Sequence, residues 1–93
     1  MDYLKEPKLI RNSKVAWQEI DDAIVVVTPW NKQIHIISET ASMLWRALAL
    51  PKSEKDLVTL IVQEYEIDEV RAEQDIRTFI KESIEKGIVD IKE

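Results

Sequence analysis

Residues 34–45 read Ile34-His35-Ile36-Ile37-Ser38-Glu39-Thr40-Ala41-Ser42-Met43-Leu44-Trp45, an apolar run joined without a spacer to a helical pattern. Three of the first four residues are β-branched, which is typical of a strand. The apolar residues then recur with the spacing of one helix face, at Ala41, Leu44, Trp45 and Leu48. Ser38 and Thr40 can each accept a hydrogen bond from a free backbone N–H at the helix start. Such a junction fixes a sheet against helices, so we expect a binding site close to it.

Two further strands are expected before this junction. The first covers residues 15–20, and the second covers residues 23–28, which contain the β-branched run Ile24–Val27. Asp21-Asp22 and Pro29–Lys32 have the composition of turns, and the third strand follows at residues 33–37. Because the links are short, we expect an antiparallel meander. Residues 1–14 are mixed and polar, and we interpret them as an N-terminal arm or a short leading strand.

Three helices are expected in the second half of the chain. The first runs from about Thr40 to Leu48 or Leu50, where Pro51 blocks its continuation. Ser53 precedes Asp56 by three residues, a variant of the capping box that opens the second helix. Asp68 is a plausible N-cap for the third helix.

The third helix is expected to end at Lys86-Gly87, with the only glycine of the chain in the left-handed position, and Ile88–Ile91 follows as a short extended piece. The predicted fold class is therefore α+β. It consists of a three-stranded antiparallel β-sheet followed by a three-helix unit that is like a winged helix-turn-helix.

Composition excludes several kinds of chemistry. The 93 residues allow one domain, residues 1–93, with a modest core. Cysteine is absent and His35 is the single histidine, so no thiolate nucleophile, iron–sulfur cluster or histidine-rich metal site is expected. The acid pairs Asp21-Asp22 and Asp68-Glu69 have sufficient explanations as a turn and a helix start. We therefore expect no catalytic residue, no metal and no cofactor.

Charge and hydropathy limit the partners. The net charge of −5 disfavours binding to nucleic acid, and acids outnumber bases between Asp68 and Lys86, where a DNA-recognition helix is net basic. No apolar run approaches the roughly 20 residues that span a bilayer. The sequence shows no apolar signal segment at its start, so a cytoplasmic protein is expected.

Two segments resemble the PqqD-like proteins, also called RiPP recognition elements. Residues 37–45, Ile37-Ser38-Glu39-Thr40-Ala41-Ser42-Met43-Leu44-Trp45, are similar to the family signature Leu-Asn-x-Thr-Ala-x-x-Ile-Trp. Residues 75–89 are similar to its ending Asp-Val-x-x-Phe-Leu-x-x-Leu-x-x-x-Gly-Leu-Val. Ser38 replaces the usual Asn and keeps an acceptor. Ser83 replaces the usual Leu, with Ile84 one position later, so Ile84 points either towards a surface groove or, after a slight helix rotation, into the core.

The resemblance implies a specific function. Family members bind the leader segment of a ribosomally made precursor peptide and deliver it to a modifying enzyme, such as a radical SAM enzyme, a cyclase or a leader peptidase. The leader would add as a strand to residues 33–37 and lie against the third helix, which is a known mode of peptide recognition at sheet edges. The expected peptide-binding residues are Gln33, Ile34, His35, Ile36, Arg77, Ile80, Lys81 and Ile84. Arg77, Lys81 and Ile84 form a cationic and apolar strip suited to a peptide with acidic and aliphatic side chains.

Several alternatives stay open at the level of sequence. A winged-helix DNA-binding transcription factor is the alternative function. A third possibility is a homodimer paired through the free strand edge, which is compatible with peptide recognition. Trp17 and Trp45 are expected in the core, whereas for Trp30 a binding role and partial packing are equally supported. The sequence does not identify the precursor peptide, its modification, the partner enzyme, the oligomeric state or the face of the strand that meets the peptide.

Overall fold

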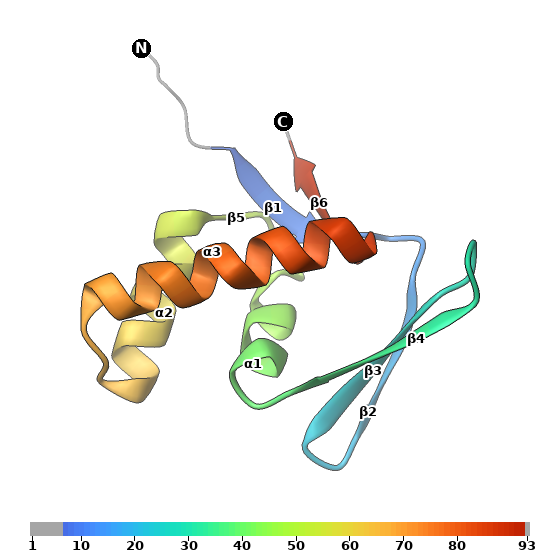
Figure 1. Cartoon of the computed structure of the whole chain (residues 1–93), viewed down its shortest axis with the longest axis horizontal. Coiled ribbons are helices and arrows are strands. Elements are labelled where there is room, and N and C mark those ends of the chain that lie inside the picture. Colours follow the sequence, from blue (N-terminus) through green and yellow to red (C-terminus); the bar gives the residue numbers. More distant parts are fainter. Residues whose placement is uncertain (1–6, 93) are drawn as a thin grey trace.

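The computed structural model describes residues 7–92, apart from the side chain of Ser38. The elements follow in the order β1 (Lys8–Arg11), β2 (Ala16–Ile20), β3 (Ala23–Thr28), β4 (Gln33–Ser38), α1 (Thr40–Ala47), β5 (Lys52–Ser53), α2 (Glu54–Tyr65), α3 (Glu69–Lys86) and β6 (Val89–Lys92). Figure 1 shows α3 lying across α1 and α2, with β2, β3 and β4 extending to one side. The predicted α+β class, with an antiparallel sheet followed by three helices, is confirmed.

The first sheet is the expected meander, with strand order β2-β3-β4. Each strand pairs antiparallel with the next, and Ile24 lies opposite both Glu19 of β2 and Ile37 of β4. Along β3 the side chains alternate between buried and half-buried positions, as a sheet with one covered face requires. Among the described residues, β2 and β4 are therefore the two edges of this sheet.

A second sheet joins the two ends of the chain, with strand order β5-β1-β6. Leu9 of β1 lies opposite Lys52 of β5 on one side and Ile91 of β6 on the other. The sequence predicted a leading strand within residues 1–14 and a terminal extended piece, but it did not predict that they pair. The part of that arm formed by residues 1–6 lies outside the described residues.

The junction between β4 and α1 differs from the expected capping. Glu39 is the N-cap residue, with φ 54° and ψ −123°, and it makes no side-chain cap hydrogen bond. Thr40 is already the first helical residue, so the predicted capping role of Thr40 is wrong. Instead, the buried hydroxyl of Ser42 donates to the carbonyl oxygen of Ile37 over 2.9 Å. The first turn of α1 is thereby tied back to the buried Ile37 of the strand.

The caps of the other two helices are as predicted. The Ser53 Oγ accepts from the Asp56 N–H and the Asp56 carboxylate accepts from the Ser53 N–H, each over 3.0 Å. The Ser53 N–H and hydroxyl and the charges of nearby lysines lower the pKa of the Asp56 carboxyl against the opposing effect of burial. Asp68 accepts from the N–H of Arg71, and Gly87 ends α3 in the left-handed conformation.

One hydrophobic core holds the two sheets and the helices together. Trp45 is its largest fully buried side chain, and it packs with Ile24 of β3, Leu57 of α2 and Ile76 of α3. On the surface, Arg46 of α1 makes a two-pronged contact with the Glu19 carboxylate, at 2.9 and 3.2 Å, and this hydrogen bonding lowers the pKa of Glu19. In the part of the chain from residue 7 to 92, no helix is long and apolar enough to cross a membrane.

We predict that Gly87→Ala destabilises the fold by about 1–3 kcal/mol, because a residue other than glycine is strained in the left-handed region. The φ angle of Gly87 is +80°, and an added Cβ would lie 2.9 Å from Cζ2 of Trp30. The substitution therefore also displaces an indole. Urea unfolding at 25 °C measures the loss of free energy.

Lys86→Ala, one residue earlier and still helical, is the matched control and should change stability by less than about 0.5 kcal/mol. In a Trp30→Ala background the cost of Gly87→Ala should become smaller, because the indole is no longer displaced. Equal costs in both backgrounds would show that Trp30 does not pack against Gly87.

Candidate functional site

The edge strand β4 has two chemically different faces. His35 and Ile37 lie opposite the fully buried Val26 and Ile24 of β3, so they point to the covered side of the sheet. Ile34 and Ile36 point the other way and are 67% and 74% exposed. The sequence-predicted residues of this strand thus divide between an inner and an outer face, as period-two alternation requires.

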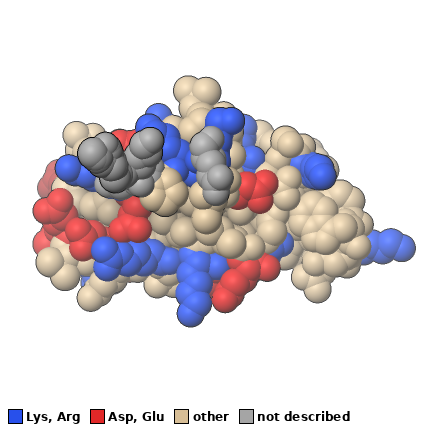
Figure 2. Space-filling view, turned by 90° about the horizontal axis from the view of Figure 1, so that it is seen from above, with Lys and Arg blue, Asp and Glu red and all other residues tan. Residues whose placement is uncertain are grey.

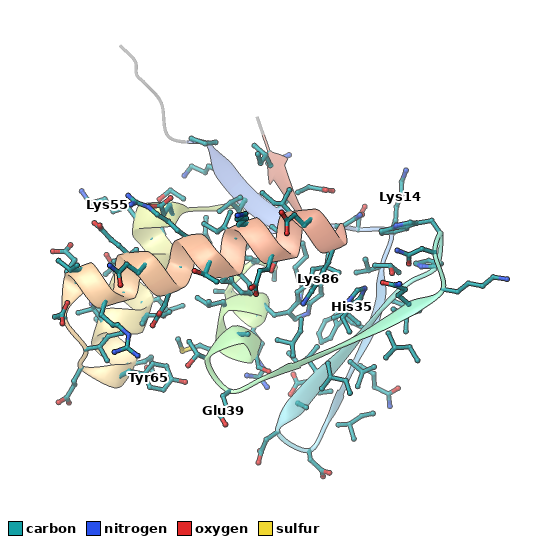
Figure 3. All side chains as sticks on the ribbon, viewed as in Figure 1. Lys14, His35, Glu39, Lys55, Tyr65 and Lys86 are labelled. Atoms are coloured by element: carbon teal, nitrogen blue, oxygen red, sulfur yellow. The ribbon has the colours of Figure 1, made fainter. Side chains whose placement is uncertain are left out.

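His35 is held at the inner face by a buried threonine. Its Nε2 lies 3.2 Å from Oγ1 of Thr28, whose hydroxyl also contacts the side-chain oxygen of Asn31. This contact gives the half-buried imidazole a structural role in the strand, as the sequence suggested for an isolated histidine. Figure 3 shows the side chains of His35 and Lys86 between the C-terminal end of α3 and the sheet in that view.

A cleft of about 260 Å³ lies between α1 and α3, beside the point where β4 enters α1. Its floor and walls are mainly apolar, and two carboxylates of α3 lie at its rim. We call it the α1–α3 cleft, and it is lined by Thr40, Ala41, Leu44, Ile61, Asp75, Thr78, Phe79 and Glu82. Because Thr40 follows β4 by one residue, the cleft lies at the C-terminal end of the edge strand.

The other end of β4 also touches α3. Trp30, in the turn between β3 and β4, packs against Gly87 at the end of the helix while its side chain stays 53% exposed. Partial packing of Trp30 is thus observed. The edge strand runs from the Gly87 contact to the α1–α3 cleft, so its free edge passes alongside α3 (Figure 1).

The structure places the sequence-predicted residues of α3 away from this cleft. Arg77 binds Glu54 of α2 through its Nε over 3.0 Å. Ile80 and Ile84 line a different cleft of about 180 Å³, the β1–α3 cleft, together with Pro7, Leu9, Glu54 and Ile91. Lys81 is exposed and lines neither cleft. The structure does not bring these four side chains together with Gln33–Ile36.

The burial of Ser83 shows which face of α3 points into the core. Ser83 is 4% exposed, whereas Ile84 is 37% exposed, so the helix does not turn to bury the isoleucine. The buried stripe runs through Ala72, Ile76 and Ser83, and Asp75, Phe79 and Glu82 lie on the flank towards α1. Sequence reasoning missed this flank. Ile84 faces a surface cleft, one of the two positions that the sequence left open, but that cleft lies beside β1. Phe79, one turn before the buried Ser83, is the residue that marks the flank beside α1.

Trp17 is less buried than expected. It is 42% exposed and meets the buried Trp45 edge to face, with ring centroids 6.1 Å apart. The guanidinium of Arg11 covers the Trp17 ring at 4.8 Å from its centroid. The prediction that Trp17 lies in the core is therefore wrong, because its inward-facing position on β2 is covered by an arginine and one aromatic edge rather than by apolar side chains.

Within residues 7–92, no group of three or more acidic, histidine or cysteine side chains is arranged to hold a metal ion. Near β4, the side chains of Thr28, Asn31 and His35 are engaged in local hydrogen bonds. What the site offers is a free backbone edge, exposed isoleucines and an apolar cleft. These are the elements of peptide recognition.

Comparison with known proteins agrees with this geometry. The model of a family described as coenzyme PQQ synthesis protein D (PqqD) matches residues 23–89. This span includes β3, β4, all three helices and the start of β6. No curated protein sequence matches the chain.

Two solved structures share the fold. TbiB1 in complex with the TbiA(beta) leader peptide has a TM-score of 0.80 and 23% sequence identity, over 87% of this chain and 94% of that one. Lasso peptide synthetase B1 complexed with the leader peptide has a TM-score of 0.78 and 20% identity, over 88% and 96% of the two chains.

We predict that the two faces of β4 differ in their effect on stability. Ile37→Ala should cost about 2–5 kcal/mol because it opens a hole in the core. Ile36→Ala, its exposed neighbour, is the matched control and should cost less than about 1 kcal/mol. Urea unfolding of both variants measures the difference. A larger cost for Ile36→Ala than for Ile37→Ala would indicate that β4 is shifted by one residue, since such a shift exchanges its faces.

Proposed function

The chain belongs to the PqqD family, and from this premise we propose that it binds the leader segment of a ribosomally made precursor peptide. The observation that carries the proposal is the free edge of β4 running alongside α3 to the α1–α3 cleft. The two similar structures are of proteins complexed with leader peptides, which supports the proposal.

The leader adds to β4 as a fourth strand of the β2-β3-β4 sheet. An edge strand presents unpaired N–H and C=O groups, and an extended peptide that pairs with them gains affinity from backbone hydrogen bonds. A peptide side chain near the C-terminal end of β4 then reaches the cleft and supplies specificity. Gln33, Ile34, His35 and Ile36 are the residues of β4 that we propose to meet the peptide in this way.

The flank of α3 that faces α1 provides the other wall, through Thr78 and Phe79. The residues expected from the sequence, Arg77, Ile80, Lys81 and Ile84, remain the alternative wall. For a peptide to meet them it would have to cross α3 towards the β1–α3 cleft, away from β4. Affinities of Phe79→Leu and Ile84→Ala variants separate the two walls, with melting curves to correct for stability.

In this proposal the protein delivers the leader peptide and does not itself catalyse a reaction. In the PqqD-like proteins the bound leader is handed to a modifying enzyme, and we propose such a partner here, in the class of radical SAM enzymes, cyclases or leader peptidases. Binding by strand addition requires no reactive side chain, and the free edge of β4 also permits a homodimer in the absence of peptide. The whole chain then acts as a single peptide-recognition domain.

The alternative of a DNA-binding winged helix has little support. Figure 2 shows Lys and Arg side chains interspersed with Asp and Glu over the face seen from above, including grey areas that are not described. Duplex DNA binding depends on neutralising successive phosphates with a basic surface, and the net charge of the chain is −5.

We predict that the protein selects extended peptides of roughly 10–20 residues and does not bind duplex DNA at physiological salt. Selection from a display library of random 15-residue peptides, followed by fluorescence anisotropy on the enriched sequences, measures the first part. Anisotropy with a labelled DNA duplex measures the second. Salt-sensitive, sub-micromolar binding to the duplex, without peptide enrichment, would favour the transcription factor instead.

We also predict that proline in β4 weakens peptide binding at least tenfold, which is about 1.4 kcal/mol. Proline removes an N–H and restricts the backbone. Inward and outward N–H groups alternate along an edge strand, so Ile34→Pro, His35→Pro and Ile36→Pro are compared in variants whose melting curves show that they fold.

Gln18→Pro and Glu19→Pro on β2, the opposite edge, are the matched controls and should leave peptide affinity within about twofold. If no folded variant with proline between Gln33 and Ile37 binds more weakly than these controls, strand addition at β4 is wrong.

A further inference from the structure

The α1–α3 cleft combines an apolar floor with an acidic rim. Ala41, Leu44 and Phe79 are among the apolar residues that line it, and Asp75 and Glu82 are its two charged residues. None of the Lys and Arg residues between positions 7 and 92 lines it. From this combination, and resting on the proposed function, we propose that the protein selects leader peptides in which one large apolar side chain is flanked by lysine or arginine.

The size of the cleft suits a single side chain. Pockets for drug-sized ligands have volumes of about 300–1,000 Å³, whereas this cleft measures about 260 Å³. It lies where β4 passes into Thr40 of α1, so a peptide paired with β4 has a side chain above it near the C-terminal end of the strand. An aliphatic or aromatic side chain placed there loses its contact with water against Leu44 and Phe79.

The rim supplies the preference for charge. Asp75 forms an exposed ion pair with Arg71, with 3.6 Å between Oδ2 and Nε. A surface ion pair of this kind offsets the charge of Asp75 only weakly. Glu82 forms no ion pair with any residue between 7 and 92. Glu39, exposed at the start of α1, does not line the cleft, and its side chain points away from α3 (Figure 3). A cation beside the anchor side chain is attracted by Asp75 and Glu82, and an acid is repelled.

The basic residues of α3 do not reverse this preference. Arg77 is engaged with Glu54 on the far flank of the helix, at 3.0 Å. Lys86 lies one turn beyond Glu82 on the same flank of α3 and outside the residues that line the cleft, so it offsets part of the charge of Glu82, whereas Asp75 lies nearer to the other end of the helix. An acidic and aliphatic peptide, which the sequence favoured through Arg77 and Lys81, therefore finds acids rather than bases at the cleft.

The test starts from the sequences enriched in the random 15-residue peptide selection. We expect them to share a large apolar residue with Lys or Arg within two positions of it. Replacing that cation with Glu in the best peptide should weaken binding about tenfold at low salt and less at high salt. Glu82→Gln should weaken binding of the cationic peptide about two- to fivefold.

Glu85→Gln, an exposed acid of α3 outside the cleft, is the matched control and should leave affinity unchanged. Glu82→Lys should restore part of the affinity of the peptide whose cation was replaced with Glu. Enriched peptides that bind but carry no cation, or equal effects of Glu82→Gln and Glu85→Gln, overturn the charge preference and leave the proposed function standing. No enriched peptide at all overturns the proposed function itself.

Discussion

The hydrogen bond from the buried hydroxyl of Ser42 to the carbonyl oxygen of Ile37 determines how the sheet and the helices meet. It leaves no linker between β4 and α1, so the direction of the strand sets the direction of the helix. Leu44 and Trp45 follow Ser42 into the core, and the rest of the core packs around this indole. Because α1 and α3 contribute to one hydrophobic core and border the same cleft, the placement of α1 also influences the distance between α3 and the edge of β4.

Features that depend on neighbouring residues could be predicted from the sequence. The capping box at Ser53, the N-cap at Asp68 and the left-handed Gly87 each require only a few adjacent positions, and all three are present. The meander of β2, β3 and β4 follows in the same way from short links. The pairing of β1 with β6 could not be predicted, since it joins segments at opposite ends of the chain and no local pattern specifies it.

The candidate site shows the same division. The edge strand was predicted from its composition, but the flank of α3 that faces it was not, because one residue of rotation exchanges the flanks. Ser83 is polar and buried while Ile84 is apolar and partly exposed, so Ile84 does face a surface cleft, but that cleft lies beside β1 and not beside β4. The charges of α3 misled for a related reason. Their number along the sequence does not reveal that Arg77 is held by α2 while Asp75 and Glu82 border the cleft.

The opposite faces of β4 have a consequence for the precursor genes that such a chain can serve. In a paired strand only every second side chain points to a given face, so a bound peptide would contact each face of the sheet with every second residue. In a peptide paired with β4, side chains on the outer face would lie beside the exposed Ile34 and Ile36. Only the alternate side chains, on the inner face of the sheet, would point towards α3. An insertion of one codon in the leader would exchange the two sets, whereas an insertion of two would preserve them. Leader sequences that diverge under this constraint should therefore keep the parity of spacing between their important residues more strictly than the residues in between.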